Sequence, residues 1–156
     1  MNLNQNQVGL AGEYYVLAQL TAHGYLATLT LDHSTGVAIL VTNYDINKIF
    51  KVKVKTSIKK PSKSKYFGDG KFYTWAMNEK HERIMKLNLV YCFVHFHDAL
   101  SLPKFFLVPS MQVADYVEWQ HKFWLKESGG RDTAMRQFRI NTKDPHYYEN
   151  NWTLFN

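Results

Sequence analysis

The chain has 156 residues, a formal net charge of +6, 46% hydrophobic and 15% aromatic residues, and one cysteine. This length predicts a single domain, residues 1–156, with a core of its own, and the composition excludes a disordered chain. One cysteine excludes an internal disulfide and a cysteine-based zinc site. Because the polar start does not resemble a signal peptide and no apolar run is long enough to span a bilayer, we expect a cytoplasmic protein without a membrane partner.

The first half of the chain predicts a helix followed by three strands. Apolar residues recur at helical spacing over 7–23. Residues 25–31 alternate and are rich in strand formers, and the apolar run 37–43 is typical of a strand covered on both faces. Residues 49–56 alternate between valine and lysine. The short, turn-prone link 44–47 makes the last two strands an antiparallel hairpin.

The second half predicts one clear loop and then further strands and helices. Residues 59–70 are rich in Pro, Ser, Lys and Gly, which argues against regular structure. After this loop we expect a strand over 71–76, a short helix over 78–85 with Asn78 as N-cap, strands over 89–96 and 105–108, a helix over 110–126, a weak strand near 138–140 and a short helix around 147–152. The order predicts an α/β domain with a central mixed β-sheet flanked by helices.

Three stretches carry a resemblance to a known superfamily: GLAGEYYVLAQLTAHGY at 9–25, GVAILVTNYDINKIFKVKVKTS at 36–57, and the later run of YCFVHF, FFLVPSMQVADYV and NNWTLF. Together they resemble the PD-(D/E)XK nucleases, in small bacterial members with a Gly-Glu first helix and a strand ending Val-Lys-Thr-Ser. The resemblance implies a restriction-endonuclease-like fold. It also implies a site in which a helix glutamate, a strand aspartate and a Glu/Gln-x-Lys motif hold Mg²⁺ and activate water.

Two of the four positions of this implied site depart from the pattern. Glu13 matches the helix glutamate and Lys55 the motif lysine, whereas Ala38 stands at the aspartate position and Lys53 at the Glu/Gln position. The resemblance therefore implies a degenerate catalytic site with no metal ligand set, and a Mg²⁺ cofactor only where other acids complete it. A single engineered knockout would leave residue 53 alone, so Lys53 favours natural divergence.

Other acids are poor substitutes for the missing carboxylate. A turn centred on Asp45 and Ile46 places Ala38 across from Lys53, and Asp45 itself roughly 20 Å from Ala38. Asp32 precedes a His-Ser-Thr-Gly turn, and we do not expect it to complete a metal site. The sequence pattern does not indicate where Asp69 and Glu79 lie in the fold. Because one glutamate would face two lysines, we expect the pocket to suit a phosphate or sulfate better than Mg²⁺.

A run of lysines with no acid among them follows Asp45 and ends before Asp69. Lysines in such a run neutralise phosphates, and the resemblance favours a nucleic acid partner, DNA in particular. The alternative is a solvated edge strand whose lysines discourage sheet-to-sheet aggregation. The candidate nucleic-acid-binding residues are Lys51, Lys53, Lys55, Lys59, Lys60, Lys63 and Lys65.

Two histidines and the cysteine have plain structural interpretations. His95 and His97 share a strand face, a spacing that metals use, but no third ligand is evident, so we interpret the pair as packing and surface chemistry. Cys92 points to the other face and is expected in the core. Most aromatic side chains are also expected in the core, and an exposed subset would indicate stacking on bases or an oligomer interface.

Three functions remain open from the sequence. The leading hypothesis is a nuclease-like DNA-binding protein that has lost phosphodiesterase activity, a pseudoenzyme. The second is an active Mg²⁺-dependent endodeoxyribonuclease with a rearranged acid set. The third is a protein-interaction module, such as a homodimer, on the nuclease scaffold. Fold alone does not choose among them.

Overall fold

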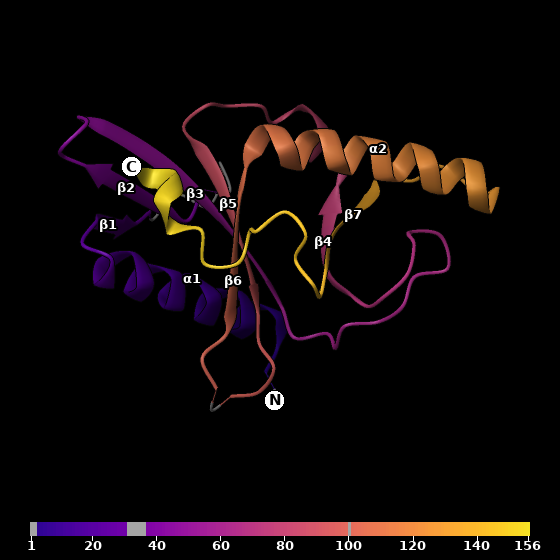
Figure 1. Ribbon diagram of the computed structural model, residues 1–156, viewed down its shortest axis with the longest axis horizontal. Coiled ribbons are helices and arrows are strands. Elements are labelled where there is room, and N and C mark those ends of the chain that lie inside the picture. The colour runs from indigo at the N-terminus through magenta and orange to yellow at the C-terminus, as the bar shows by residue number, and fades with distance from the viewer. Residues whose placement is uncertain (1–2, 31–36, 100) are drawn as a thin grey trace.

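The computed structural model describes residues 3–30, 37–99 and 101–156. Their elements, in chain order, are α1 (Gln5–Ala22), β1 (Leu26–Leu29), β2 (Ile39–Asn43), β3 (Lys48–Ser57), β4 (Phe72–Asn78), the 3₁₀ helix η1 (Glu79–Arg83), β5 (Leu89–His95), β6 (Lys104–Pro109), α2 (Ser110–Ser128), β7 (Met135–Asn141) and the 3₁₀ helix η2 (Trp152–Phe155). Figure 1 shows α1 and α2 on opposite sides of the strands. The predicted mixed α/β architecture is confirmed.

Five strands form a mixed sheet in the order β1-β2-β3-β5-β6, and β4 pairs with β7 in a separate antiparallel sheet. β3 and β5 run parallel, and the other neighbours run antiparallel. The interpretation of the lysine strand as an edge strand is wrong, because β3 lies in the middle of the larger sheet. A strand that alternates valine and lysine can lie at a solvated sheet edge or beside a polar pocket. The sequence pattern alone does not distinguish these two environments.

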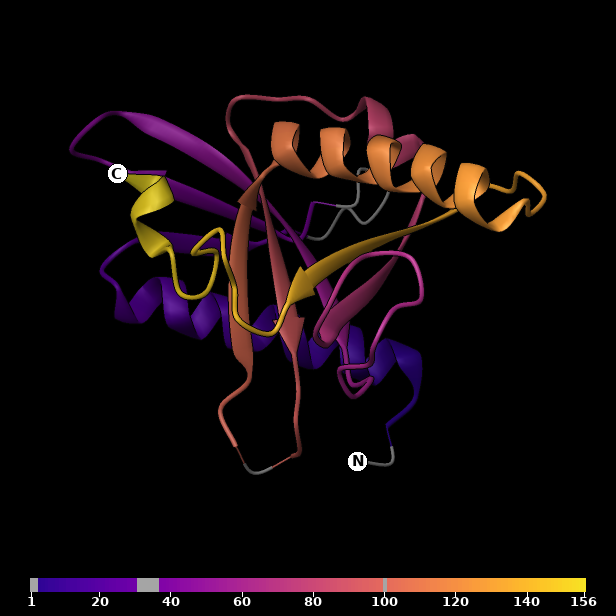
Figure 2. The same ribbon diagram turned by 45° about the vertical axis from the view of Figure 1, so that its right-hand side comes forward.

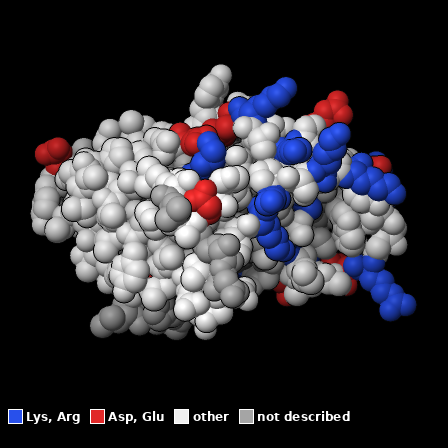
Figure 3. Space-filling view, turned by 90° about the horizontal axis from the view of Figure 1, so that it is seen from below, with Lys and Arg blue, Asp and Glu red and all other residues white. Residues whose placement is uncertain are grey.

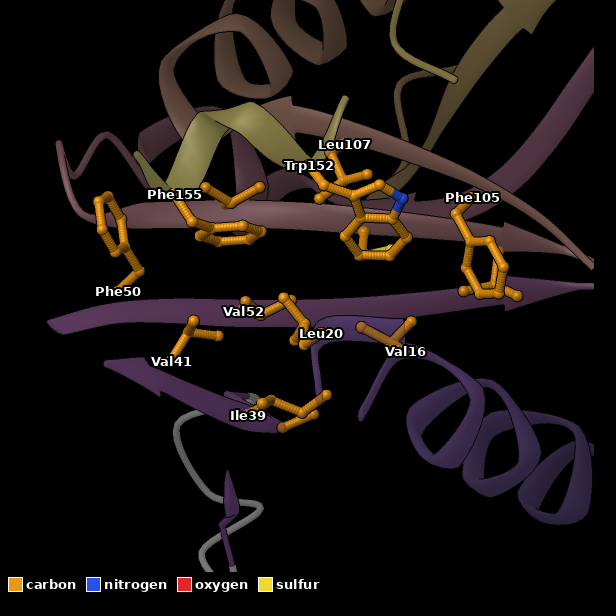
Figure 4. Packing of buried hydrophobic residues seen from close by; sticks show 14 of the residues in the cluster. Val16, Leu20, Ile39, Val41, Phe50, Val52, Phe105, Leu107, Trp152 and Phe155 are labelled. Carbon is orange, nitrogen blue, oxygen red and sulfur yellow. The ribbon is translucent and has the colours of Figure 1, made fainter. Parts of the chain in front are cut away.

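Two apolar clusters fix the layers of the domain. One face of the larger sheet packs against Val16 and Leu20 of α1 and against Trp152 and Phe155 of η2; Figure 4 shows these side chains meeting between helix and strands. The other face packs against α2 and the β4–β7 pair, through residues such as Phe138. β5, in the sheet centre, is thereby buried along its whole length, as is typical of a strand in a parallel pair.

Several predicted elements differ from the observed ones in extent or type. The strand over 37–43 is not covered on both faces, because buried and exposed residues alternate along β2. The helix over 78–85 is the short 3₁₀ helix η1, and the Asn78 side chain makes no capping hydrogen bond. The helix around 147–152 is not formed, because Glu149 makes a β-bridge to Phe106 and the helical turn begins only at Trp152.

The contact between α1 and β3 determines where the first helix lies over the sheet. Asn4 and Gln7 form a reciprocal capping box that starts α1. Five residues after Gln7, a Cβ atom on Gly12 would lie 2.0 Å from Oγ1 of Thr56, so only glycine permits this close approach. Glu13, the next residue, is thereby brought near the second half of β3.

Replacing Gly12 by alanine is expected to destabilise the protein by about 1–3 kcal/mol, because backbone must shift to accommodate the methyl group. Gly9→Ala is the matched control on the same helix, where an added Cβ meets nothing within 4 Å. Alanine there should stabilise by roughly 0.5–1 kcal/mol through helix propensity alone. Thermal unfolding of both variants measures the difference, and equal melting temperatures would contradict the close α1–β3 contact.

Candidate functional site

A pocket of about 190 Å³ opens where strand pairing ends. β2 pairs only with the first part of β3, from Lys48 to Val52. Beyond that point, within the described part of the chain, no strand pairs with β3 on its β2 side. The pocket lies at this open edge and is lined by Glu13, Val37, Ala38, Lys53, Val54, Lys55, Lys80 and His81.

The pocket brings together all four positions implied by the sequence resemblance. Glu13 comes from α1, Ala38 from the segment before β2, and Lys53 and Lys55 from β3. Ala38 donates its backbone N–H to the Val52 carbonyl at 2.9 Å, which continues the β2–β3 register and sets residue 38 beside residue 53. The hairpin register expected from the sequence is thus confirmed.

The two β3 lysines are not members of an exposed stripe. Lys53 is only 7% exposed, and Lys55 is half-buried beside it on the same face of the strand. Burial lowers the pKa of Lys53, and the nearby ammonium groups of Lys55, Lys80 and Lys86 lower it further. Burial and then Lys80 likewise lower the pKa of Lys55. Cations that repel one another in this way make the pocket receptive to an anion.

Sequence reasoning missed two residues of the pocket, Lys80 and His81, because the segment after β4 carried no motif and was predicted only as a short helix. His81 is 2% exposed, and its Nδ1 lies 2.8 Å from the Tyr91 hydroxyl. Its other nitrogen, Nε2, is buried and has no hydrogen-bond partner among the described residues. Such a nitrogen costs about 1–3 kcal/mol unless a bound group satisfies it.

The described side chains of this pocket do not provide the ligands that a Mg²⁺ site needs. Mg²⁺ requires hard oxygen ligands in near-octahedral geometry. Among the described lining residues, Glu13 is the one carboxylate, and it shares the pocket with three lysines. The described residues also contain no group of three or more His, Cys, Asp or Glu side chains placed to hold a metal ion. Ala38 offers a methyl group at the position of the implied aspartate.

Three of the acids weighed as substitutes do not line the pocket. Asp45 is in the hairpin turn, and Asp69 and Glu79 are not among the residues that line the pocket. Asp32 lies outside the described residues, as does the end of the predicted strand over 25–31.

The remaining candidate lysines lie away from the pocket. Lys51 is half-buried on β3 and does not line it. The exposed loop lysines surround a second hollow, described below; they are Lys59, Lys60, Lys63 and Lys65. Figure 3 views the molecule from below relative to Figure 1. On the face seen there, lysine and arginine side chains gather toward the right-hand end.

The histidine pair and the cysteine have the structural roles expected of them. His95 is buried, and its Nε2 lies 3.0 Å from the Lys59 carbonyl oxygen, whereas His97 is exposed. The two histidines do not belong to any metal-binding group of the described residues. Cys92 is fully buried, and burial raises the pKa of its thiol. It is a small core residue and not a reactive group.

His81 makes stability depend on pH. Burial, followed by Lys55, Lys53 and Lys80, lowers the pKa of His81 from 6.5 to about 3. Between these values the unfolded chain binds a proton that the folded protein does not. The free energy of unfolding therefore contains the full contribution of neutral His81 above about pH 6.5. It falls as the pH decreases below that value, by at most about 1.4 kcal/mol per pH unit.

We expect urea unfolding in phosphate-free buffer to show this loss between about pH 7.5 and about pH 5 in the wild-type protein. His81→Gln should remove most of the dependence, while His97→Gln, at an exposed histidine, should retain it. Identical pH profiles for wild type and His81→Gln would show that His81 titrates normally.

Comparisons with known proteins identify the fold. Neither a protein-family model nor a curated protein matches this chain. The structure is similar to that of a bacterial homing endonuclease, I-Ssp6803I, with a TM-score of 0.55 and 13% sequence identity over 97% of this chain and 90% of that one. Among the described residues, no helix has the length and apolar character needed to cross a membrane. The chain thus has the restriction-endonuclease-like fold, a mixed sheet with helices on both sides, in common with that structure.

Proposed function

We propose that this chain is a nucleic-acid-binding protein on an endonuclease-like scaffold that has lost metal-dependent phosphodiesterase activity. Its pocket holds a phosphate group of the nucleic acid in the place where the resembled nucleases hold Mg²⁺. The observation that carries the proposal is the charge of the pocket. Among the described residues that line it, three carry an ammonium group, Lys53, Lys55 and Lys80, and one carries a carboxylate, Glu13.

Physical chemistry favours an anion in such a pocket. A divalent cation entering it would meet a net positive charge at short range, where charges are weakly screened. A phosphate oxygen instead accepts charge-assisted hydrogen bonds from ammonium groups, which are roughly twice as strong as neutral ones. His81 adds a nitrogen without a partner among the described residues. An anion seated beside it would raise the pKa of the ring and favour its protonated, donating form.

Two further observations support a polymeric ligand over a free anion. The exposed lysines of the β3–β4 loop extend the positive charge beyond the pocket, as backbone phosphates require. The similarity of fold to a homing endonuclease gives a scaffold of a kind that serves DNA cleavage elsewhere. Neither observation depends on catalysis by this chain.

A native gel with labelled single- and double-stranded DNA, in Mg²⁺ and in rising salt, tests the proposal. We expect a shifted but uncut product that salt releases steeply. Lys55→Gln should weaken the shift, whereas Lys48→Gln, an exposed lysine at the hairpin tip, should leave it nearly unchanged. Cut DNA whose cleavage requires Glu13 would overturn the proposal and favour an endonuclease with another set of acids. Free, intact DNA at low salt would favour a protein-interaction module.

A further inference from the structure

A second hollow, of about 410 Å³, lies along the loop that follows β3 and faces the β4–β7 sheet. We call it the loop groove; it is lined by residues 59–67 except Pro61, by Phe72 and Thr74 of β4, by Gln137 and Arg139 of β7, and by Trp124 of α2. In Figure 2 the β3–β4 loop runs beside β7 below the end of α2. The groove therefore combines a loop, a sheet face and a helix in one surface.

The loop groove is strongly cationic. Lysines 59, 60, 63 and 65 and Arg139 line it, and none of the described residues that line it is a carboxylate. An uninterrupted set of cations along a groove tracks a phosphodiester backbone. Ordinary solvated surfaces mix both signs, so this composition indicates an anionic polymer.

The loop that carries these lysines is fixed in place. The Phe67 ring packs against Trp119 and Phe123 of α2, with centroids 6.1 and 5.6 Å apart. At the other end of the loop, Ser62 forms a β-bridge with Phe72. A loop held at two points loses less conformational entropy on binding, so its lysines are pre-organised for a ligand.

Arg139 is the residue of the loop groove best suited to bind a phosphate. Its guanidinium lies 4.5 Å from the centre of the Phe67 ring and donates to the Gln137 side-chain oxygen. Its Nη1 is buried and has no hydrogen-bond partner among the described residues, and none of the ion pairs found among them includes Arg139. Burial lowers the pKa of Arg139, and Tyr116 offsets part of this effect. A planar guanidinium can donate two parallel hydrogen bonds to two oxygens of a phosphate.

Trp124 adds a surface on which a base can stack. The indole is half-buried, and the His121 ring stacks against it with centroids 5.9 Å apart. His121 does not line the loop groove, so it supports the indole from outside the groove. A duplex hides the faces of its bases, whereas unpaired nucleotides expose them to aromatic side chains.

From this combination we propose that the loop groove binds unpaired nucleotides, with a phosphate on Arg139 and the loop lysines and a base stacked on Trp124. The proposal rests on the proposed function and names the form of nucleic acid that this protein prefers. Single-stranded DNA, single-stranded RNA and melted ends of a duplex share this chemistry.

Fluorescence anisotropy of the full chain with four labelled probes of equal length tests the inference: an oligo-dT, an oligo-rU, an abasic oligonucleotide and a duplex. We expect the two unpaired, base-bearing probes to bind about tenfold more tightly than the abasic one, because stacking requires a base. Trp124→Ala should abolish that difference, and Trp124→Tyr, which keeps an aromatic face, should retain most of it. The dT and rU probes also distinguish a DNA from an RNA ligand.

Matched controls come from the far hairpin tip, where Tyr44 is 73% exposed. Tyr44→Ala should bind all probes as the wild type does, while Arg139→Gln should weaken every probe, including the abasic one. Equal affinity for base-bearing and abasic probes, or an unchanged difference in Trp124→Ala, would overturn the inference. If the duplex binds best, the inference fails and the proposed function stands; if no probe binds, both fail.

Discussion

Replacing Ala38 by aspartate and Lys53 by glutamate is expected to give the pocket a saturable affinity for Mn²⁺ that the wild-type protein lacks. Residues 38 and 53 are neighbours across the β2–β3 hairpin and line the same pocket as Glu13. Among the described lining residues, the two changes would raise the number of carboxylates from one to three and remove one of three ammonium groups. Carboxylate oxygens are the ligands that such hard cations prefer, and the expected dissociation constant lies in the millimolar range or below it.

Isothermal titration calorimetry with Mn²⁺ measures this gain. The matched control carries Ala38→Asn and Lys53→Gln, which have similar shapes but add no negative charge, and we expect it to show no saturable binding. Wild-type protein that binds Mn²⁺ as tightly as the double variant would show that an acid outside the described residues already completes a metal site.

Replacing the four loop lysines, at positions 59, 60, 63 and 65, by glutamine is expected to produce the largest loss of nucleic acid affinity. Each lysine that neutralises a phosphate contributes about 0.9 to the slope of log affinity against log salt for duplex DNA and about 0.7 for a single strand. The slope should therefore fall by roughly three to four. The affinity at about 0.1 M salt should fall on the order of 10³-fold if all four contact phosphates.

Anisotropy titrations across a salt series check this result. A control with the same loss of net charge replaces Lys48, Lys122, Lys126 and Lys143, none of which lines the pocket or the loop groove. We expect the control to lose far less affinity. Equal losses in both variants would mean that net charge, and not the loop, attracts the nucleic acid.

Much of the fold followed from local pattern. The helix over residues 7–23 corresponds to α1, the strand over 49–56 to β3 and the helix over 110–126 to α2. Each is long and regular in its periodicity, and α2 ends at Gly129 in the left-handed conformation that glycine adopts readily. The short tail elements were less well predicted, because the pairing of Glu149 with Phe106 depends on contacts distant in sequence.

The position of β3 within the sheet could not be predicted from local periodicity. Residues 49–56 alternate, but alternation does not say which strands lie on either side. A solvated edge would leave Lys53 and Lys55 in water, whereas in the structure they line a pocket together with residues of α1 and η1. Their burial requires the tertiary structure to be known.

The candidate site was predictable only where its residues belong to a motif. Glu13, Ala38, Lys53 and Lys55 were found through the resemblance, and the structure places them in one pocket. Lys80 and His81 come from a segment without a recognisable signal, brought in by the chain after β4. Trp124 and Arg139 of the loop groove lie on α2 and β7, far from the lysines in sequence, and became candidates only through spatial proximity.

The measurement that tests the central claim most directly is an NMR titration that follows the His81 ring, assigned with His81→Gln, as inorganic phosphate and Mg²⁺ are added separately. The account predicts a saturable phosphate-induced shift of the His81 signals that is lost in Lys55→Gln, and no saturable change with Mg²⁺. A saturable response to Mg²⁺ that disappears in Glu13→Ala, with none to phosphate, would contradict the account and indicate a metal site in this pocket.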